Sequence, residues 1–253
     1  MNIEKNRFCI NRKMAPGLTI EAFFRLVQNL GFNKVELRND MPGGHVADEL
    51  NYTQVRNLAD KYQLDIVTIN AVYPFNQLNE EVLKKTEGLL RDAQGVGAKA
   101  LVLCPLNDGT IVPPDVTIEA IKRLSNLFAK YDIQGIVEPL GFRTSSLRSI
   151  AFAQQLIREA TSPFKVLLDT FHHHLYEDAE KEFTAKIDIS AIGLVHLSGV
   201  EDCRPTEELT DEQRIMLREG ANKQVISSQA DSLIKISRIW ADFFPANTSN
   251  QPI

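Results

Sequence analysis

The sequence has few cysteines, no basic tract and no long hydrophobic run, and each absence excludes a class of protein. Its three cysteines are odd in number and widely scattered among 253 residues, which argues against a disulfide framework and favours a reducing compartment. No apolar stretch approaches the roughly 20 residues of a membrane span, and residues 1–7 contain no apolar signal core. We therefore predict a cytoplasmic protein with no membrane partner.

Net charge and chain length further limit the function classes and the number of domains. The net charge is −5, with acidic and basic residues mixed along the chain, so a broad nucleic-acid surface is not expected. Apolar residues make up 43% of the chain, which suffices for one large domain, and α/β barrels of about 250 residues are routinely single domains. We predict one domain over residues 1–253.

Strand-like and helix-like segments alternate along the first 200 residues. Short apolar runs predict seven strands, at residues 8–10, 34–38, 65–70, 98–105, 135–139, 166–172 and 193–199. Amphipathic segments predict the helices between them, at residues 19–30, 51–62, 79–96, 118–131, 147–160 and 178–185. This alternation is typical of a parallel sheet, and seven repeats favour a closed eight-stranded barrel over a doubly wound sheet.

The C-terminal part fits the pattern less well. Residues 206–229 are polar, and Ile239–Pro245 is the one late candidate for an eighth strand. No closing helix is evident after it, so the barrel either closes irregularly or departs from the usual pattern at this end. The predicted fold class is α/β, a (β/α)8 TIM barrel.

Three of the predicted strands end in an ionisable residue. The runs GIVEP, VLLDTFH and GLVHLSG place Glu138, Asp169 and His196 at these ends. Because the C-terminal ends of barrel strands meet on one rim, where active sites lie, we expect the three side chains to converge. One acid at a strand end is commonly a helix cap, but three acid or imidazole groups in register are harder to explain in that way. Two carboxylates and one imidazole suit a divalent metal ion.

The endings VEP, LDTFH and VHLS resemble those of the xylose isomerase-like barrels of the sugar isomerase/epimerase family. That family includes inosose isomerases and dehydratases, hydroxypyruvate isomerases and ketose 3-epimerases. The resemblance runs in order from residue 7 to about residue 200. It implies one divalent ion, Mn²⁺ or Mg²⁺ by preference with Zn²⁺ and Co²⁺ as alternatives, held by Glu138, Asp169, His196 and an acid at the end of the eighth strand. The family usually has Glu there, whereas the matching ADFFP run offers Asp242, one methylene shorter.

The resemblance also implies a proton transfer beside the carbonyl of a small sugar, keto-polyol or inosose. In that reaction the ion chelates the carbonyl and a neighbouring hydroxyl and stabilises an enediolate, while a carboxylate moves the proton. Glu138 is the expected base, with Asp242 opposite it. The expected substrate-binding residues are Glu36 and Asn70 at two strand ends, Arg143 as partner for an anionic group, and His172 at the start of a loop, where it could equally hold Asp169.

Two other functions stay open. The first is a metal-dependent dehydratase of the same barrel, with His172 as the acid near the leaving hydroxyl. The second is a non-catalytic barrel that has lost the fourth ligand. A DNA-repair phosphodiesterase of this architecture needs more histidines than the five present, three of which are consecutive. The predicted partner is a small sugar or polyol, and a homo-oligomer is compatible with barrels of this kind.

Overall fold

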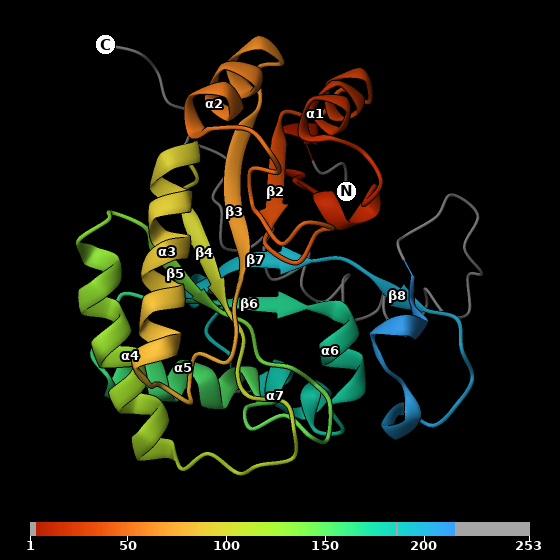
Figure 1. Ribbon diagram of the computed structural model, residues 1–253. Coiled ribbons are helices and arrows are strands. Elements are labelled where there is room, and N and C mark those ends of the chain that lie inside the picture. The colour runs from red at the N-terminus through yellow and green to blue at the C-terminus, as the bar shows by residue number, and fades with distance from the viewer. Residues whose placement is uncertain (1–3, 186, 216–253) are drawn as a thin grey trace, which may run out of the picture.

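Seven strands of the computed structural model form one parallel sheet (Figure 1). The structure describes residues 4–185 and 187–215. The strands are β1 (Ile10–Asn11), β2 (Lys34–Arg38), β3 (Asp65–Val72), β4 (Ala100–Leu103), β5 (Gln134–Val137), β6 (Lys165–Asp169) and β7 (Ile192–His196). Each strand pairs in parallel with the next one in chain order, which gives the curled sheet of a TIM barrel.

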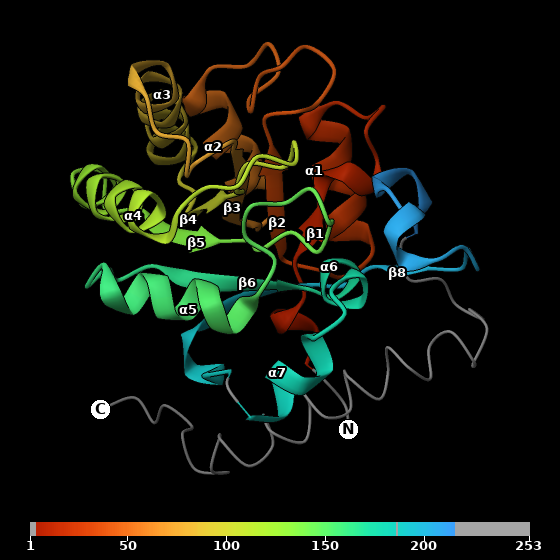
Figure 2. The same ribbon diagram turned by 90° about the horizontal axis from the view of Figure 1, so that it is seen from below.

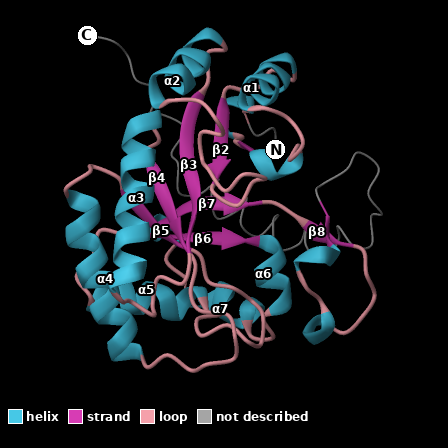
Figure 3. Ribbon diagram, in the orientation of Figure 1, coloured by secondary structure: helices cyan, strands magenta, loops and turns pink. Residues whose placement is uncertain are grey.

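Helices connect the strands on the outer side of the curled sheet (Figure 2). They are α1 (Ile20–Asn29), α2 (Tyr52–Lys61), α3 (Glu80–Val96), α4 (Pro114–Ala129), α5 (Ile150–Glu159) and α7 (Ala179–Ala185). Helix α6 (Thr170–Leu175) instead lies at the end of β6 (Figure 1). Figure 3 shows the strands gathered inside these helices. Among the described residues, no helix is long and apolar enough to cross a membrane.

Helix α1 begins and ends close to the residues that the sequence predicts. Thr19 caps α1 by accepting a hydrogen bond from the backbone N–H of Ala22. Beyond the end of this helix, Gly31 adopts φ +78°, a left-handed conformation that glycine tolerates best. Phe23 and Phe24 are fully buried, so the apolar face of α1 packs against the sheet. The strand and helix alternation is thereby confirmed.

Two short elements were not predicted. Helix α6 follows β6 directly, whereas the strand was predicted to continue to residue 172 and a loop to follow. The helix begins here because the carboxylate of Asp169 caps it by accepting hydrogen bonds from the N–H groups of Phe171 and His172. A hairpin pairs β8 (Gly199–Val200) with β9 (Arg214–Ile215) across residues 201–213. It sits outside the barrel sheet, beside α6 (Figure 1, Figure 2). The predicted eighth strand, Ile239–Pro245, lies outside the described residues.

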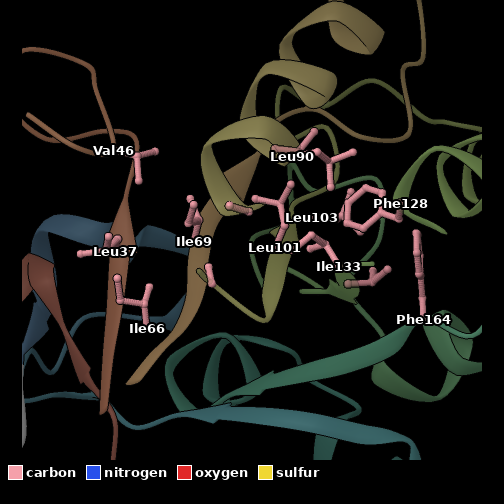
Figure 4. Close-up of a cluster of buried hydrophobic side chains, with 14 of the residues drawn as sticks. Leu37, Val46, Ile66, Ile69, Leu90, Leu101, Leu103, Phe128, Ile133 and Phe164 are labelled. Carbon is pink, nitrogen blue, oxygen red and sulfur yellow. The ribbon is translucent and has the colours of Figure 1, made fainter. Parts of the chain in front are cut away.

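Two apolar clusters lie on opposite faces of the sheet. The larger one fills the space between strands and helices (Figure 4) and includes Leu37, Ile69, Leu90, Leu101, Leu103, Phe128 and Phe164. The smaller one lies on the inner face and consists of Ala100, Val102, Ile136 and Leu167. Successive residues of a strand point to opposite faces, so these two clusters identify which residues point into the barrel.

Candidate metal centre and active site

The alternation along the strands carries three polar side chains inward. On β5, Ile136 belongs to the inner cluster and Val137 to the outer one, so Glu138 points inward. The same alternation applies to Asp169 at the end of β6 and His196 at the end of β7. The C-terminal ends of parallel strands lie at one rim of the sheet, and there these residues meet.

The three side chains offer ligand atoms that lie close together. One atom from each of Glu138, Asp169 and His196 lies within 4.8 Å of the others. His196 Nδ1 is 3.5 Å from Glu138 Oε1 and 3.7 Å from Asp169 Oδ2. Donor atoms bound about 2.0–2.2 Å from one ion lie roughly 3–4 Å from one another. The three residues therefore fit a divalent metal ion in spacing, as they do in chemistry.

The remaining polar atom of each candidate ligand has a hydrogen-bond partner. Glu138 Oε2 accepts from the Sγ–H of Cys104 at 3.5 Å. Asp169 Oδ1 accepts from the N–H of Phe171 at 2.7 Å. His196 Nε2 lies 3.1 Å from Glu36 Oε2. Such contacts fix the direction in which metal ligands point, and here each directs the second donor atom of its residue toward the common centre. The centre-facing atom of Asp169, Oδ2, also accepts a hydrogen bond from Arg214 of β9.

Burial and charge act in opposite directions on the Glu36–His196 pair. Burial alone would raise the pKa of Glu36, but the charge of His196 and the hydrogen bonds from His196 and Thr68 outweigh it and lower this pKa. Burial alone would lower the pKa of His196, but the surrounding carboxylates, Glu36 foremost, raise it well above 6.5. The two groups therefore form an ion pair inside the barrel.

Arg214 of β9 belongs to the site and was not predicted from the sequence. Its Nη1 donates to Asp169 Oδ2 at 2.5 Å, and its Nη2 donates to His172 Nε2 at 3.1 Å. Its guanidinium lies 4.5 Å from the ring centroid of Phe171. No local signal marks this arginine, because only the pairing of β9 with β8 brings it to the rim.

The position of His172 corrects one prediction and refines its role. It lies in helix α6, not in a loop, and only 5% of it is exposed. Burial lowers its pKa, so the ring is neutral at pH 7. Since arginine can only donate, His172 Nε2 accepts from Arg214, and the ring proton is assigned to Nδ1. That Nδ1 has no hydrogen-bond partner among the described residues.

The other predicted site residues are spread more widely. Asn70 is buried within β3. The side chain of Arg143 is 65% exposed and lies 3.7 Å from Glu207, so the structure does not bring it to the three ligands. Asp242, the predicted fourth ligand and second catalytic acid, lies outside the described residues. The substrate and metal roles assigned from the sequence remain predictions.

A small hollow adjoins the site. Asp169, His172 and Tyr176 are among the residues that line it, and its cavity volume is about 10 Å³. A cavity of this volume holds about one water molecule. This hollow is therefore too small to hold a sugar.

Comparisons with known proteins place the chain in a family. The family model of xylose isomerase-like TIM barrels matches residues 24–224. A xylose isomerase domain-containing protein from Salmonella typhimurium LT2 is 79% identical, with a TM-score of 0.87, over 92% of this chain and 86% of that one. No curated protein sequence matches significantly. The chain belongs to the xylose isomerase-like TIM barrel family.

Two more distant structures share the fold. The IolI protein, solved with a bound zinc atom, is 18% identical with a TM-score of 0.75, over 89% of this chain and 84% of that one. The 3-keto-D-glucoside 4-epimerase YcjR from E. coli is 16% identical with a TM-score of 0.62, over 90% of this chain and 99% of that one. At these identities the similarity establishes the fold alone.

Proposed function

We propose that this member of the xylose isomerase-like TIM barrel family is a divalent-metal-dependent isomerase or epimerase of a small sugar, keto-polyol or inosose. The observation that carries the proposal is the convergence of Glu138, Asp169 and His196 at the rim. The zinc atom of the IolI protein and the activity of YcjR, both in the same fold, support it.

The metal would be held by Glu138 Oε1, Asp169 Oδ2 and His196 Nδ1, the atoms that face one another. Asp242 stays the proposed fourth ligand. Two carboxylates and one imidazole suit Mn²⁺ or Mg²⁺, and Zn²⁺ also accepts this set. When bound, a divalent ion supplies polarisation of the substrate carbonyl and stabilises negative charge on its oxygens.

Glu138 is the proposed base that moves the proton. It is 4% exposed, so little water competes for it. Its Oε2 accepts the hydrogen bond of the Cys104 thiol, and a thiol is a weak donor, so this contact occupies the oxygen only weakly. Removal of a proton from the carbon beside the carbonyl, and its return to the neighbouring carbon or the opposite face, needs such an oxygen.

The charges around the site favour an uncharged substrate. Arg214 is paired with Asp169 and Asp211. Arg38, two residues after Glu36 on β2, is bound by Asp40 through two hydrogen bonds of 2.6 and 2.9 Å. Since both guanidinium groups already have carboxylate partners, we propose a neutral polyol ketone or aldehyde. We propose Arg214 and His172 as the residues that contact its hydroxyl groups.

Proton exchange tests this function. Protein supplied with Mn²⁺ would be incubated in D₂O with a panel of neutral keto-sugars and inososes, and deuterium beside the carbonyl would be followed by NMR. We expect exchange with at least one of them, lost in Glu138→Gln and kept in Glu81→Gln, whose side chain is 75% exposed on α3. Absence of exchange across the panel in metal-loaded protein would contradict the proposal.

Removal of water is the second candidate reaction. The Nδ1–H of His172 has no partner among the described residues and could donate to a leaving hydroxyl. The same incubation separates the two reactions, because a dehydratase product has lost one water whereas an isomer or epimer keeps the mass of the substrate. A product that has lost water, formed by the parent and not by His172→Phe, would favour the dehydratase.

A further inference from the structure

Glu36 lies within the site without facing its centre. We propose that Glu36 is a positioning residue that fixes the ring of His196 so that Nδ1, and not Nε2, is the metal ligand. This replaces the substrate contact expected from the sequence. The inference rests on the metal site of the proposed function, but the orientation of His196 can be tested without the metal.

Both carboxylate oxygens of Glu36 already accept hydrogen bonds. Asn11 donates to Oε1 through its side-chain amide. Thr68 donates to Oε2 at 2.5 Å, and His196 Nε2 lies 3.1 Å from the same oxygen. Glu36 is 2% exposed. A carboxylate that is buried and bound by three groups has little capacity left for a substrate hydroxyl.

These contacts determine which nitrogen of His196 is left for a metal ion. A carboxylate can only accept hydrogen bonds, so Nε2 must carry a proton when it bonds to Glu36. Nδ1 is then the nitrogen that faces Glu138 and Asp169, at 3.5 and 3.7 Å. A metal-bound histidine commonly donates its other N–H to a carboxylate, which sets the ring orientation.

The network spans the sheet. Asn11, Glu36 and Thr68 lie on β1, β2 and β3, at one end of the strand order, whereas His196 lies on β7 at the other end. Glu36 and His196 are 160 residues apart in sequence. The first three strands therefore orient a ligand that the last described strand of the barrel sheet contributes.

Two measurements on one set of variants test the inference. The first is the affinity for Mn²⁺, measured by calorimetry. The second is the Nε2–H proton signal of His196 in protein labelled with ¹⁵N-histidine, assigned with His196→Gln and recorded without metal. The variants are Glu36→Ala, Glu36→Gln and Thr68→Val, with Thr86→Val as the matched control. Thr86 is fully buried but bonds within its own helix, to the carbonyl of Val82.

We expect Glu36→Ala to lose the Nε2–H signal and to bind Mn²⁺ about 10–100-fold more weakly. Glu36→Gln keeps an oxygen acceptor and the shape of the side chain, so it should keep the signal and lose less affinity. Thr68→Val should weaken binding by a smaller factor, and Thr86→Val should change neither property. Glu36→Gln and Thr68→Val keep the test available if Glu36→Ala does not fold.

Two results would overturn the inference. One is Glu36→Ala with the Nε2–H signal and the Mn²⁺ affinity of the parent. The other is a variant that binds Mn²⁺ normally but requires much more substrate for half-maximal exchange, because this would restore Glu36 to the substrate. If the parent binds no metal, the proposed function fails, and the Nε2–H signal alone decides whether Glu36 holds His196.

Discussion

Gly141 lies where the loop after β5 passes against helix α6, and its replacement by alanine should disturb the site from outside. A Cβ at this position would lie 2.0 Å from the carbonyl oxygen of His172 and 2.8 Å from the Cβ of Leu175. Ordinary Cβ contacts begin at 3.4 Å, so the backbone must move by more than 1 Å. Arg148 bonds the carbonyl of Gly141 at 2.8 and 3.0 Å and the carbonyl of Leu175 at 3.2 Å. It thereby ties the loop to α6, so the shift should reach α6.

We expect Gly141→Ala to cost about 1–3 kcal/mol of unfolding free energy, the usual range for an overpacked site. A displacement of about 1 Å at His172 should also lower the exchange rate about 100-fold. Urea unfolding measures the first effect, and deuterium exchange into the substrate measures the second in protein that is still folded.

Two other glycines provide matched controls. Gly135 lies near the start of β5, away from the rim, and a Cβ there would lie 2.4 Å from the ring of Phe164. Gly135→Ala should therefore destabilise the fold but leave the exchange rate of the folded protein near that of the parent. A Cβ on Gly88 meets nothing within 4 Å. Because Gly88 lies inside helix α3, Gly88→Ala should raise the free energy of unfolding by roughly 0.5–1 kcal/mol. Gly141→Ala with the stability and rate of the parent would refute the reasoning.

Three further predictions concern charge. Arg148→Met should cost about 2–3 kcal/mol in urea unfolding, because it leaves the carbonyls of Gly141 and Leu175 without their charged donor. Arg143→Met, at a 65% exposed side chain, should cost under about 0.5 kcal/mol; equal losses would contradict this contrast. Burial lowers the pKa of His196, but Glu36 and the other carboxylates raise it well above 6.5. Mn²⁺ must therefore displace a proton from His196, and the affinity of the protein for Mn²⁺ should rise up to about tenfold per pH unit through neutrality. Calorimetry that shows no pH dependence of this affinity would be inconsistent with the prediction. Burial raises the pKa of Asp169, but hydrogen bonding to His196 and the charge of Arg214 lower it below 3.8. The stability it provides is therefore present above about pH 4 and lost in acid, and acid titration of metal-free Asp169→Asn should show a smaller loss.

The fold could be predicted largely because its signals are local. Thr19 and Asn51 accept hydrogen bonds from residues three positions ahead. The starts of α1 and α2 can therefore be recognised from a few neighbouring residues. The apolar run before Glu138 is short and bounded by Gly135 and Pro139, and it forms β5. Helix α6 has only six residues, too few for a hydrophobic period to be recognised.

The site was predictable only in part, because many of its contacts join residues that are far apart in the sequence. The residues that end strands could be read from the chain, and the topology of a parallel barrel brings them to one rim. The partners that orient them could not be read. Arg214 is 45 residues from Asp169, and Glu36 is 160 residues from His196. No periodicity connects such pairs, and only the packed structure identifies them.

Metal content is the most direct test of the central claim. Protein purified without an affinity tag would be supplied with Mn²⁺, freed of excess ion and subjected to elemental analysis, together with Glu138→Gln, Asp242→Ala and the exposed control Glu81→Gln. We expect about one ion per chain in the parent and the control, and loss of the ion in Glu138→Gln. Loss in Asp242→Ala as well would support four protein ligands, and retention there would leave three. A parent that binds no ion, or a Glu138→Gln variant that binds as the parent does, would contradict the metal centre.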